Sequence, residues 1–461
     1  MDSRMHRAAS WVWARLRSSL WPIPVLAILV AIGLGIGLPA LDQALEDPGG
    51  QHPLTFVFGG GPSAARDVLA AIASSLISVT GLTFSFTVVA LQLSSSQYSP
   101  RLLQTFVTDR VVQSTLAVLV GTFVYSLTVL RTVRTEQAES PAFVPRASVT
   151  AAFVLTVLSV VALVLFLGHL ARSLRVETML RDVHDEARRT FASELPDDDE
   201  APHEYAVPPG DPVIATATGS GFVTDVDGLR IANAAEAGGA TVLLAHRVGD
   251  SVVAGTPVAH VWPSHPGTQP DLEAVQRSLE EAVHLGFERT PDHDVAYSLR
   301  KTVDIAVRAL SPGTNDPTTA VHALSHISAL LGELVTRPPR PLPWCDDGGV
   351  LRFLLPQWDL PALVRLGLEE PVHFADGQPA VLRRLAVVLS EVAWQAPRGA
   401  LDHQLTGYMD EVARRAETST AVDGIETDRW RRHLADALAG RWRPEPWPDR
   451  SGIRDAHPVD R

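Results

Sequence analysis

The chain has 461 residues, 46% of them hydrophobic, and a formal net charge of −13. This length is too great for one ordinary domain, and the acidic balance argues against nucleic-acid binding, which usually needs a basic surface. The single cysteine, Cys345, excludes an intrachain disulfide framework and a cysteine-based metal site. Nearly all long apolar runs lie in the first 175 residues, whereas the acidic surplus lies mostly beyond Asp182. We therefore expect a membrane domain followed by a soluble region.

Four apolar runs are long enough to cross a bilayer as helices, which takes about 20 residues. They cover residues 23–41, 65–93, 111–130 and 147–170, and their interiors hold no charged residue. Because the segment 1–22 before them is basic, a cleaved signal peptide is an alternative for the first run. We favour a retained helix, since this run is longer than a usual signal core and further spans follow. The sequence thus predicts a transmembrane domain of four helices over residues 23–172.

Arginines gather on one side of these predicted spans. They lie before the first span, between the second and third, and after the fourth, whereas the loop 42–64 is acidic. By the positive-inside rule both termini are cytoplasmic. The loop with Arg131, Arg134 and Arg146 is a mild exception, because it would lie outside.

The second span carries two polar stripes. Threonines 80, 83 and 87 share one face, and small or polar residues share the roughly opposite face. Small residues let membrane helices pack closely, and this is the interpretation that we favour from sequence alone. The sharper hypothesis is that copies of this helix line a hydroxyl-walled pore in an oligomer. The stripe in question consists of Ser74, Ser78, Gly81, Ser85, Gln92 and Ser96.

Between the second and third spans, Ser99-Pro100 predicts the start of a short interfacial helix at the cytoplasmic surface. Thr108-Asp109 can cap the third span. The fourth span continues as a charged helix over residues 172–192, and the acidic residues 197–200 then mark a linker. We expect residues 173–211 to form this connecting helix and linker.

Residues 212–263 change to short β-type runs separated by glycines. Residues 248–258 resemble the turn-rich edge of biotinyl- or lipoyl-type β-barrels. Those carriers need a modifiable lysine, whereas the only lysine of this chain, Lys301, lies elsewhere. We therefore expect a small, structural, β-barrel-like module.

Residues 264–441 follow as a mostly helical domain, which makes the cytoplasmic region α+β overall. Residues 350–355 are a predicted strand, and residues 442–461 are a charged, proline-rich tail expected to be disordered. The helical patterns cover residues 271–288, 294–310, 317–335, 360–367, 379–393, 401–416 and 427–438.

A polar corner joins two of these helices. Its sequence, residues 308–320, predicts a helix stop, a Pro-Gly turn and a new helix capped by Asp316. One interpretation is an anion pocket at the free N–H groups of the new helix. We favour the other, a helix–helix corner held by salt bridges, because capping alone explains the residues. The candidate residues are Arg300, Asp304, Arg308, Asn315, Asp316, Thr318 and Thr319.

Chemistry-bearing motifs are scarce. His322 and His326 are four apart on a helix, which is a weak metal-site candidate, since no third ligand is evident and a structural histidine pair is the commoner arrangement. The sequence holds no dinucleotide loop, Walker loop or nucleophile elbow. We expect no enzymatic activity, no cofactor and no nucleic-acid partner.

Long strings of the chain are similar to one known family. Residues 77–79, 89–101, 121–125 and 308–320 resemble the bacterial family described as predicted membrane protein, domain of unknown function 2254. The resemblance implies a multi-span inner-membrane protein with a cytoplasmic C-terminal part. It supplies no activity and no catalytic residue.

Two functions remain open at this point. The leading hypothesis is an oligomeric channel or transport-type protein, gated by its cytoplasmic region, that passes a solute or ion of unknown identity. Its partners would be the lipid bilayer and further copies of the chain. The alternative is a membrane-anchored sensor or scaffold that binds a ligand or partner near residues 308–319.

Overall fold

The computed structural model describes residues 21–45, 58–97, 109–135, 142–173, 175–195, 208–264, 269–418 and 421–443. The chain divides into two compact units, Met1–Met179 and Leu180–Arg461. Four features predicted from sequence lie wholly or mostly outside the described residues: the N-terminal segment, the interfacial helix, the acidic linker and the C-terminal tail.

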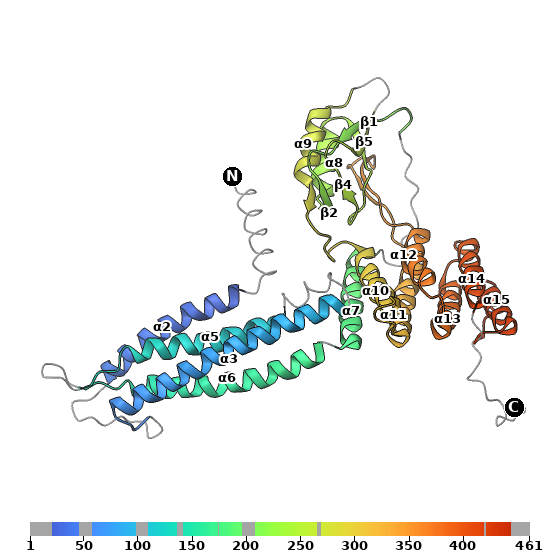
Figure 1. Cartoon of the computed structure of the whole chain (residues 1–461). Helices are drawn as coiled ribbons and strands as arrows, with labels where there is room; N and C mark the ends of the chain where they lie inside the picture. The colour runs from blue at the N-terminus through green and yellow to red at the C-terminus, as the bar shows by residue number, and fades with distance from the viewer. Residues whose placement is uncertain are drawn as a thin grey trace, which may run out of the picture. The chain divides into compact units, whose positions relative to one another are not determined.

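The described part of the first unit holds four long helices, drawn in blue to green in Figure 1. All four are long and apolar enough to cross a membrane. α5 packs against each of the other three, and Leu69, Leu119 and Tyr125 lie in their common core. The helices are α2 (Pro22–Leu45), α3 (Pro62–Gln97), α5 (Arg110–Leu130) and α6 (Arg146–Ser173).

A buried carboxylate links α2 to α6 at one end of this bundle. Asp42, near the end of α2, is only 5% exposed. Its two oxygens accept hydrogen bonds from the backbone N–H of Ala147 (3.3 Å) and from the N–H (3.0 Å) and hydroxyl (2.7 Å) of Ser148. Tyr125 of α5 donates to the Ser148 carbonyl at 3.0 Å. Asp42 therefore caps the start of α6 from another helix.

Replacing Asp42 by alanine leaves three donors of α6 without their acceptor. We expect a loss of about 2 kcal/mol in the free energy of unfolding, as for a lost helix cap with buried donors. Denaturant unfolding of the full chain in detergent micelles measures this. Gln43→Ala is the matched control, because Gln43 is the exposed neighbour on the same helix. Equal losses in the two variants would show that the cap contributes nothing.

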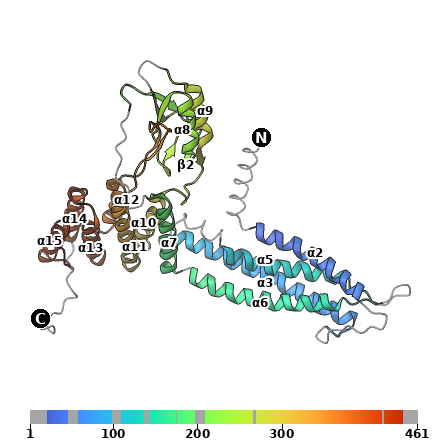
Figure 2. The same cartoon turned by 180° about the vertical axis from the view of Figure 1, so that it is seen from behind.

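The second unit holds a group of helices, seen from two sides in Figures 1 and 2. α10 packs on α11 and α12, α11 on α13, and α13 on α14 and α15. Aspartates cap α10, α11, α12 and α15, which gives part of the acidic surplus a structural role. The helices are α7 (Val176–Glu194), which begins in the first unit, α10 (Val295–Leu310), α11 (Pro317–Thr336), α12 (Leu360–His373), α13 (Pro379–Gln395), α14 (Asp402–Ala416) and α15 (Gly424–Leu438).

Two open sheets complete the second unit. One has the strand order β1-β5-β3-β8-β7 and the other β4-β2-β6. Among the strand pairs that the structure describes, only β3–β8 is parallel. Ile231, Val242 and Phe353 lie in the core between these sheets and helices α8 (Gly228–Ala237) and α9 (Leu272–Ala282). The strands are β1 (Val213–Thr216), β2 (Gly221–Val226), β3 (Ala240–Leu244), β4 (Ser251–Val252), β5 (Pro257–Pro263), β6 (Val283–Gly286), β7 (Leu342–Cys345) and β8 (Leu351–Leu355).

The prediction of a β-barrel-like module is wrong, because the strands in the described part of the chain form two open sheets and no closed barrel. The sheet of β1, β5 and β3 continues instead into β8 and β7, about 100 residues further along the chain. Thr241 of β3 donates to the Leu351 carbonyl at 3.0 Å, which fixes this distant pairing. The predicted helix 271–288 is also shorter than expected, since its last part is strand β6.

Candidate functional site

The polar stripe of α3 lies on the outside of the four-helix unit. Ser74, Ser78, Gly81, Ser85 and Gln92 are all exposed in the single chain. A Cβ added at Gly81 would have no atom within 4 Å. Ser96 is in the last turn of α3, where the backbone alone is described. The five described members thus share one surface that the chain itself does not cover.

The threonine face of α3 turns the other way, into the unit. Thr83 is 1% exposed and Thr87 is 6% exposed. Their hydroxyls donate to backbone carbonyls one turn earlier, at 2.8 and 2.9 Å, and Thr80 does the same at 2.7 Å. The threonines therefore satisfy their own hydrogen bonds while they pack among the helices. The two stripes have different roles, one internal and one external.

The exposed stripe keeps hydrogen-bond capacity. Ser74 donates to the Ala71 carbonyl and Ser78 to the Ser74 carbonyl, both at 3.1 Å. Each hydroxyl oxygen retains acceptor lone pairs, so the stripe presents acceptors to whatever covers it. Large apolar side chains border it on both sides; these are Ile77, Leu82, Phe84 and Val89.

The exposed faces of α2 and α6 have a different character. They are aliphatic and aromatic, as lipid contact requires. Their exposed large side chains include Leu26, Leu29 and Val30 of α2 and Phe153, Val157, Val164 and Leu165 of α6. α3 therefore carries the exposed surface least suited to lipid.

A contact between an aspartate and a histidine joins α5 and α6 at the opposite end from Asp42. Asp109 caps α5 by accepting from the Val111 N–H at 2.8 Å, which confirms the predicted cap. Its other oxygen lies 2.5 Å from His169 Nε2 on α6. Ser173 donates to the His169 carbonyl at 3.0 Å. His169 is not among the residues predicted from sequence, although a histidine and a serine four apart at the end of a span are a visible signal.

The polar corner is held by contacts within the helical group. Arg300 donates to Asp304 at 2.8 Å and to both carboxylate oxygens of Glu370 on α12 at 2.5 and 2.9 Å. Asp316 accepts from the N–H and hydroxyl of Thr319 at 3.1 and 2.6 Å. Glu370 was missed, because 70 residues separate it from Arg300 and no local pattern links them.

The start of α11 follows a left-handed turn. Asn315 has a φ of 46° and accepts from Gln378 Nε2 at 2.7 Å. The hydrogen bond from the Thr319 hydroxyl holds the pKa of Asp316 below its ordinary value, with smaller help from the backbone N–H groups of Thr319 and Thr318. Asp316 thus occupies N–H groups that an anion would use, and the anion pocket at this corner stays a prediction.

One of the two candidate metal ligands, His326, lies close to a third histidine. The His326 ring lies 5.2 Å from that of His184 on α7, and His322 is exposed one turn earlier on α11. Burial, and then the neighbouring His184 and His322, lower the pKa of His326. Within the residues that the structure describes, no group of three potential ligands could hold a metal ion. The metal site stays a prediction without further support.

The only lysine of the chain ties α7 to α10. Lys301 is buried, pairs with Glu186, and lies 4.9 Å from the centre of the Tyr297 ring. Ser298 also donates to Glu186, at 2.9 Å. A buried pair of this kind holds two elements in one register. α7 is therefore anchored to the helical group by specific contacts.

A second contact of α7 depends on pH. Glu194 lies 2.6 Å from His293, and this hydrogen bond raises the pKa of His293. Because the folded pKa exceeds the unfolded one of about 6.5, the stabilisation is complete below that pH and is lost as pH rises through the folded pKa. We expect less than about 1 kcal/mol from it, because His293 is half exposed.

Replacing His293 by asparagine tests this dependence. His293 has a φ of 61°, a conformation that asparagine tolerates, so the backbone is preserved. We expect the difference in unfolding free energy between about pH 6 and about pH 9 to shrink in the variant. Denaturant titrations at the two pH values measure it. An unchanged pH dependence would contradict the role assigned to this pair.

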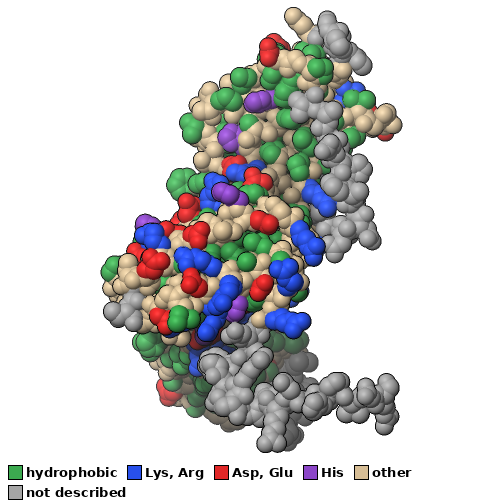
Figure 3. Space-filling view, turned by 90° about the vertical axis from the view of Figure 1, so that its right-hand side faces the viewer, with side chains coloured by type: hydrophobic (Ala, Val, Ile, Leu, Met, Phe, Trp, Pro, Cys, Tyr) green, Lys and Arg blue, Asp and Glu red, His purple; other side chains and the backbone are tan. Residues whose placement is uncertain are grey.

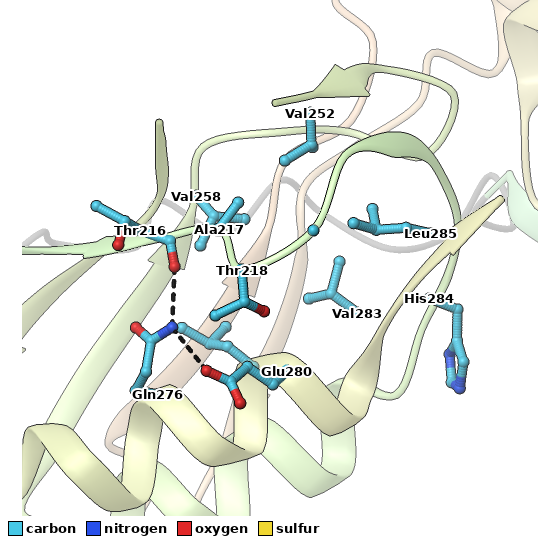
Figure 4. A pocket seen from close by; sticks show the side chains of 12 residues that line it. Thr216, Ala217, Thr218, Val252, Val258, Gln276, Glu280, Val283, His284 and Leu285 are labelled. Carbon is cyan, nitrogen blue, oxygen red and sulfur yellow. Dashed lines mark hydrogen bonds between the residues drawn. The ribbon is translucent and has the colours of Figure 1, made fainter. Parts of the chain in front are cut away.

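Two hollows lie beside α9, on either side of Gln276. One, of about 330 Å³, has apolar walls from Val252, Val258 and Leu285 (Figure 4). Gln276 Nε2 donates to the Thr216 carbonyl at 2.9 Å and lies 3.3 Å from Glu280, as the dashed lines in Figure 4 show. The other hollow, of about 440 Å³, opens along β1. Sequence reasoning could not find these hollows, since their walls come from several distant strands.

The remaining surface of the helical group is typical of a solvated face. Figure 3 shows arginines and acidic side chains intermixed on the side turned to the viewer. Ion pairs within the helical group include Arg383 with Glu426 and Arg415 with Asp376, both at 2.7 Å. Intermixed charges of both signs keep a surface soluble and do not form a single-sign binding patch.

Four apolar helices long enough to cross a bilayer, followed by a unit of helices and sheets, define a membrane protein with four candidate spans. The chain belongs to the family described as "Predicted membrane protein (DUF2254)", whose profile matches residues 17–391. This confirms the resemblance drawn from the sequence strings.

Mycobacterial proteins are among its relatives. "Uncharacterized protein Rv1290c" of Mycobacterium tuberculosis (strain ATCC 25618 / H37Rv) is 37% identical over 388 residues, which cover 82% of this chain and 72% of the relative. "Uncharacterized protein Mb1321c" of Mycobacterium bovis shows the same identity and coverage. No solved structure matches the chain significantly.

Proposed function

We propose that the protein is an oligomeric channel or transport-type membrane protein, with the exposed stripe of α3 nearest the pathway. One observation carries the proposal. In the single chain, Ser74, Ser78, Gly81, Ser85 and Gln92 lie on the outer surface of an apolar unit. Polar groups that face outward from a membrane helix need water or another protein surface, because lipid cannot satisfy them.

The dimensions and borders of the stripe favour a water-facing position. From Ser74 to Gln92 it is about 27 Å long at about 1.5 Å per residue, close to the hydrocarbon thickness of about 30 Å. Ile77 and Leu82, on its two sides, are 50% and 56% exposed. In a ring of copies, the apolar borders would pack against neighbouring helices while the narrow polar stripe faces the axis.

The C-terminal unit would gate this pathway. α7 begins at Val176, directly after α6 ends at Ser173, and Lys301 and Glu186 anchor it to α10. A ligand or partner that shifted the helical group would therefore act on the chain next to the last span. We place the protein in the bacterial inner membrane with both termini cytoplasmic, because arginines flank the spans on that side.

Flux through reconstituted protein tests the proposal. We expect lipid vesicles that contain the full chain to pass ions or small solutes under voltage or membrane tension, and empty vesicles to remain tight. A panel of monovalent ions and small neutral solutes serves as the probe. Protein that is correctly inserted and assembled, but passes none of them under either stimulus, would overturn the assignment.

A membrane-anchored sensor or scaffold is the second candidate, and the hollow of about 330 Å³ beside α9 favours it. Small-molecule sites have volumes of roughly 300–1,000 Å³ and mostly apolar walls. A ligand in this hollow would be lost in Leu285→Arg, because Leu285 lines it. A ligand at the polar corner, whose residues do not line the hollow, would instead be lost in Asp316→Ala and Arg308→Ala. Ser78→Leu would have little effect on either binding signal. The opposite pattern, with flux lost only in Ser78→Leu, would favour the channel.

A further inference from the structure

β1 is a sheet edge that no other described strand covers. It is the outermost strand of the five-stranded sheet, and among the described residues it pairs only with β5, its neighbour in Figure 1. Its four residues, Val213-Ile214-Ala215-Thr216, include no charged residue and no proline. Val213 is 42% exposed and Ile214 is 53% exposed. Open backbone groups beside exposed aliphatic side chains are a template for pairing with another strand.

The other three described edges carry features that discourage such pairing. β7 contains Pro343, which cannot donate to a ladder. β4 is two residues long. β6 exposes the polar side chain of His284, which is 48% accessible, whereas Val213 and Ile214 at the start of β1 expose aliphatic ones. Among the described strands, β1 is therefore the edge with the fewest features that oppose pairing.

A groove accompanies this edge. The hollow of about 440 Å³ lies between β1 and α9, and Val213, Ile214, Leu272 and Val275 are among its walls. Leu272 is 39% exposed, so an aliphatic surface extends from the strand onto the helix. The hydrogen bond from Gln276 to the Thr216 carbonyl holds strand and helix together (Figure 4). Because this hydrogen bond already occupies the Thr216 carbonyl, an added strand would pair with the rest of β1 and contact the aliphatic wall of the groove.

The charges on the rim of the groove match a second copy of the same chain. Glu273 and Arg277 are exposed, one turn apart on α9, and both line the groove. Neither takes part in an ion pair or a side-chain hydrogen bond among the described residues. Two β1 strands paired antiparallel are related by a two-fold axis that keeps both α9 helices on one face of the joined sheet. The helices then run antiparallel, so Glu273 of each copy faces Arg277 of the other.

We infer that β1 and α9 form a self-association surface, at which two copies of this chain join their five-stranded sheets edge to edge. The inference deepens the proposed function. It rests on that proposal in one respect, because it takes the oligomer to consist of copies of this chain. It supplies a contact between copies outside the membrane. A pair of joined C-terminal units would move together, which is what coupled gating of neighbouring copies requires.

Site-directed cross-linking of the full chain in lipid vesicles tests the surface. Cys345→Ser removes the only native thiol, and Ile214→Cys places a new one on the β1 edge. We expect a short bifunctional maleimide to convert most of this variant to covalent dimer. Val350→Cys is the matched control, because Val350 is also an exposed aliphatic residue, at 46%. It directly precedes β8, and strands β5 and β3 separate β8 from β1 in the sheet. The Val350→Cys variant should give several-fold less dimer.

A charge exchange on α9 supplies the decisive comparison. Adding Glu273→Arg to Ile214→Cys places like charges opposite each other in the dimer, and the cross-linked yield should fall several-fold. Adding Arg277→Glu as well restores opposite charges, and the yield should recover. A yield from Ile214→Cys no higher than from Val350→Cys would overturn the inference. A yield that stays the same when the charges on α9 are exchanged would overturn it as well.

The outcome is separable from that of the flux experiment. If the dimer yield changes with the charge exchange but the protein passes no ions or solutes, the self-association surface is supported and the channel assignment is wrong. If the protein passes ions or solutes but the dimer yield does not respond to the charge exchange, the channel is supported and the self-association surface is wrong.

Discussion

Gly81→Leu is expected to abolish most of the flux through reconstituted protein, while leaving the fold of the single chain intact. Gly81 is exposed at the middle of the α3 stripe, and an added Cβ would meet no atom within 4 Å. Removing a glycine from a helix interior favours the helix by up to about 1 kcal/mol, so the variant should not unfold. In an assembled pathway, a leucine from every copy would replace a small polar surface with an apolar constriction.

Gly168→Leu on α6 is the matched control. Gly168 is also an exposed helical glycine, and a Cβ there would likewise have no neighbour within 4 Å. The same change in size and polarity then falls among side chains such as Val164 and Leu165, which suit lipid. We expect wild-type flux from Gly168→Leu, measured at equal amounts of inserted protein. Equal flux from both glycine variants would contradict the placement of α3 beside the pathway.

The second large effect is a loss of stability in Gly249→Ala. Gly249 has a φ of 91°, and an added Cβ would overlap Asp294 Oδ2 and lie 2.9 Å from Arg289 Nη2. Asp294 is 2% exposed, pairs with Arg289 at 2.7 Å and caps α10 by accepting from the Ala296 N–H at 3.1 Å. The methyl group would therefore displace a buried ion pair. We expect the free energy of unfolding to fall by about 3–5 kcal/mol.

Gly255→Ala separates the clash from the backbone strain. Gly255 lies in the same sheet region and has a φ of 83°, but a Cβ there would have open space around it. Left-handed backbone alone costs an alanine roughly 1–2 kcal/mol. Denaturant unfolding of the two variants should therefore differ by about 2 kcal/mol or more. Similar losses in both would show that the Asp294–Arg289 pair adapts to the extra methyl group.

The features that sequence predicts well here are local ones. Uncharged apolar runs of bilayer length predict the four long helices, because composition alone decides that property. Asp109 and Asp316 are caps in the structure, since a cap depends on residues within one turn. The two stripes of α3 follow from helical geometry, but only packing shows that the threonine stripe is internal and the serine stripe external.

The features that sequence could not predict depend on distant partners. Glu370, His184 and Leu351 complete contacts with residues that lie far from them in the chain, and no local pattern points to such pairs. The sequence predicts a barrel-like module in place of the open sheets, because the distant partner strand leaves no local signal. The strand pattern of residues 212–263 predicts strands, whereas the partner β8 arrives only after α10 and α11. Asp42 belongs to the same class, because its role as a cap depends on α6.

Accessibility of the α3 stripe to water tests the central claim most directly. The measurement is labelling of single cysteines by a membrane-impermeant thiol reagent, in the full chain with Cys345→Ser, assembled in lipid vesicles. We predict that Ser78→Cys and Ser85→Cys are labelled, whereas Val157→Cys on α6, an exposed apolar position, is not. Cysteines at positions 78 and 85 that stay as unreactive as the one at position 157 would show that the stripe is buried between helices, and would contradict the account.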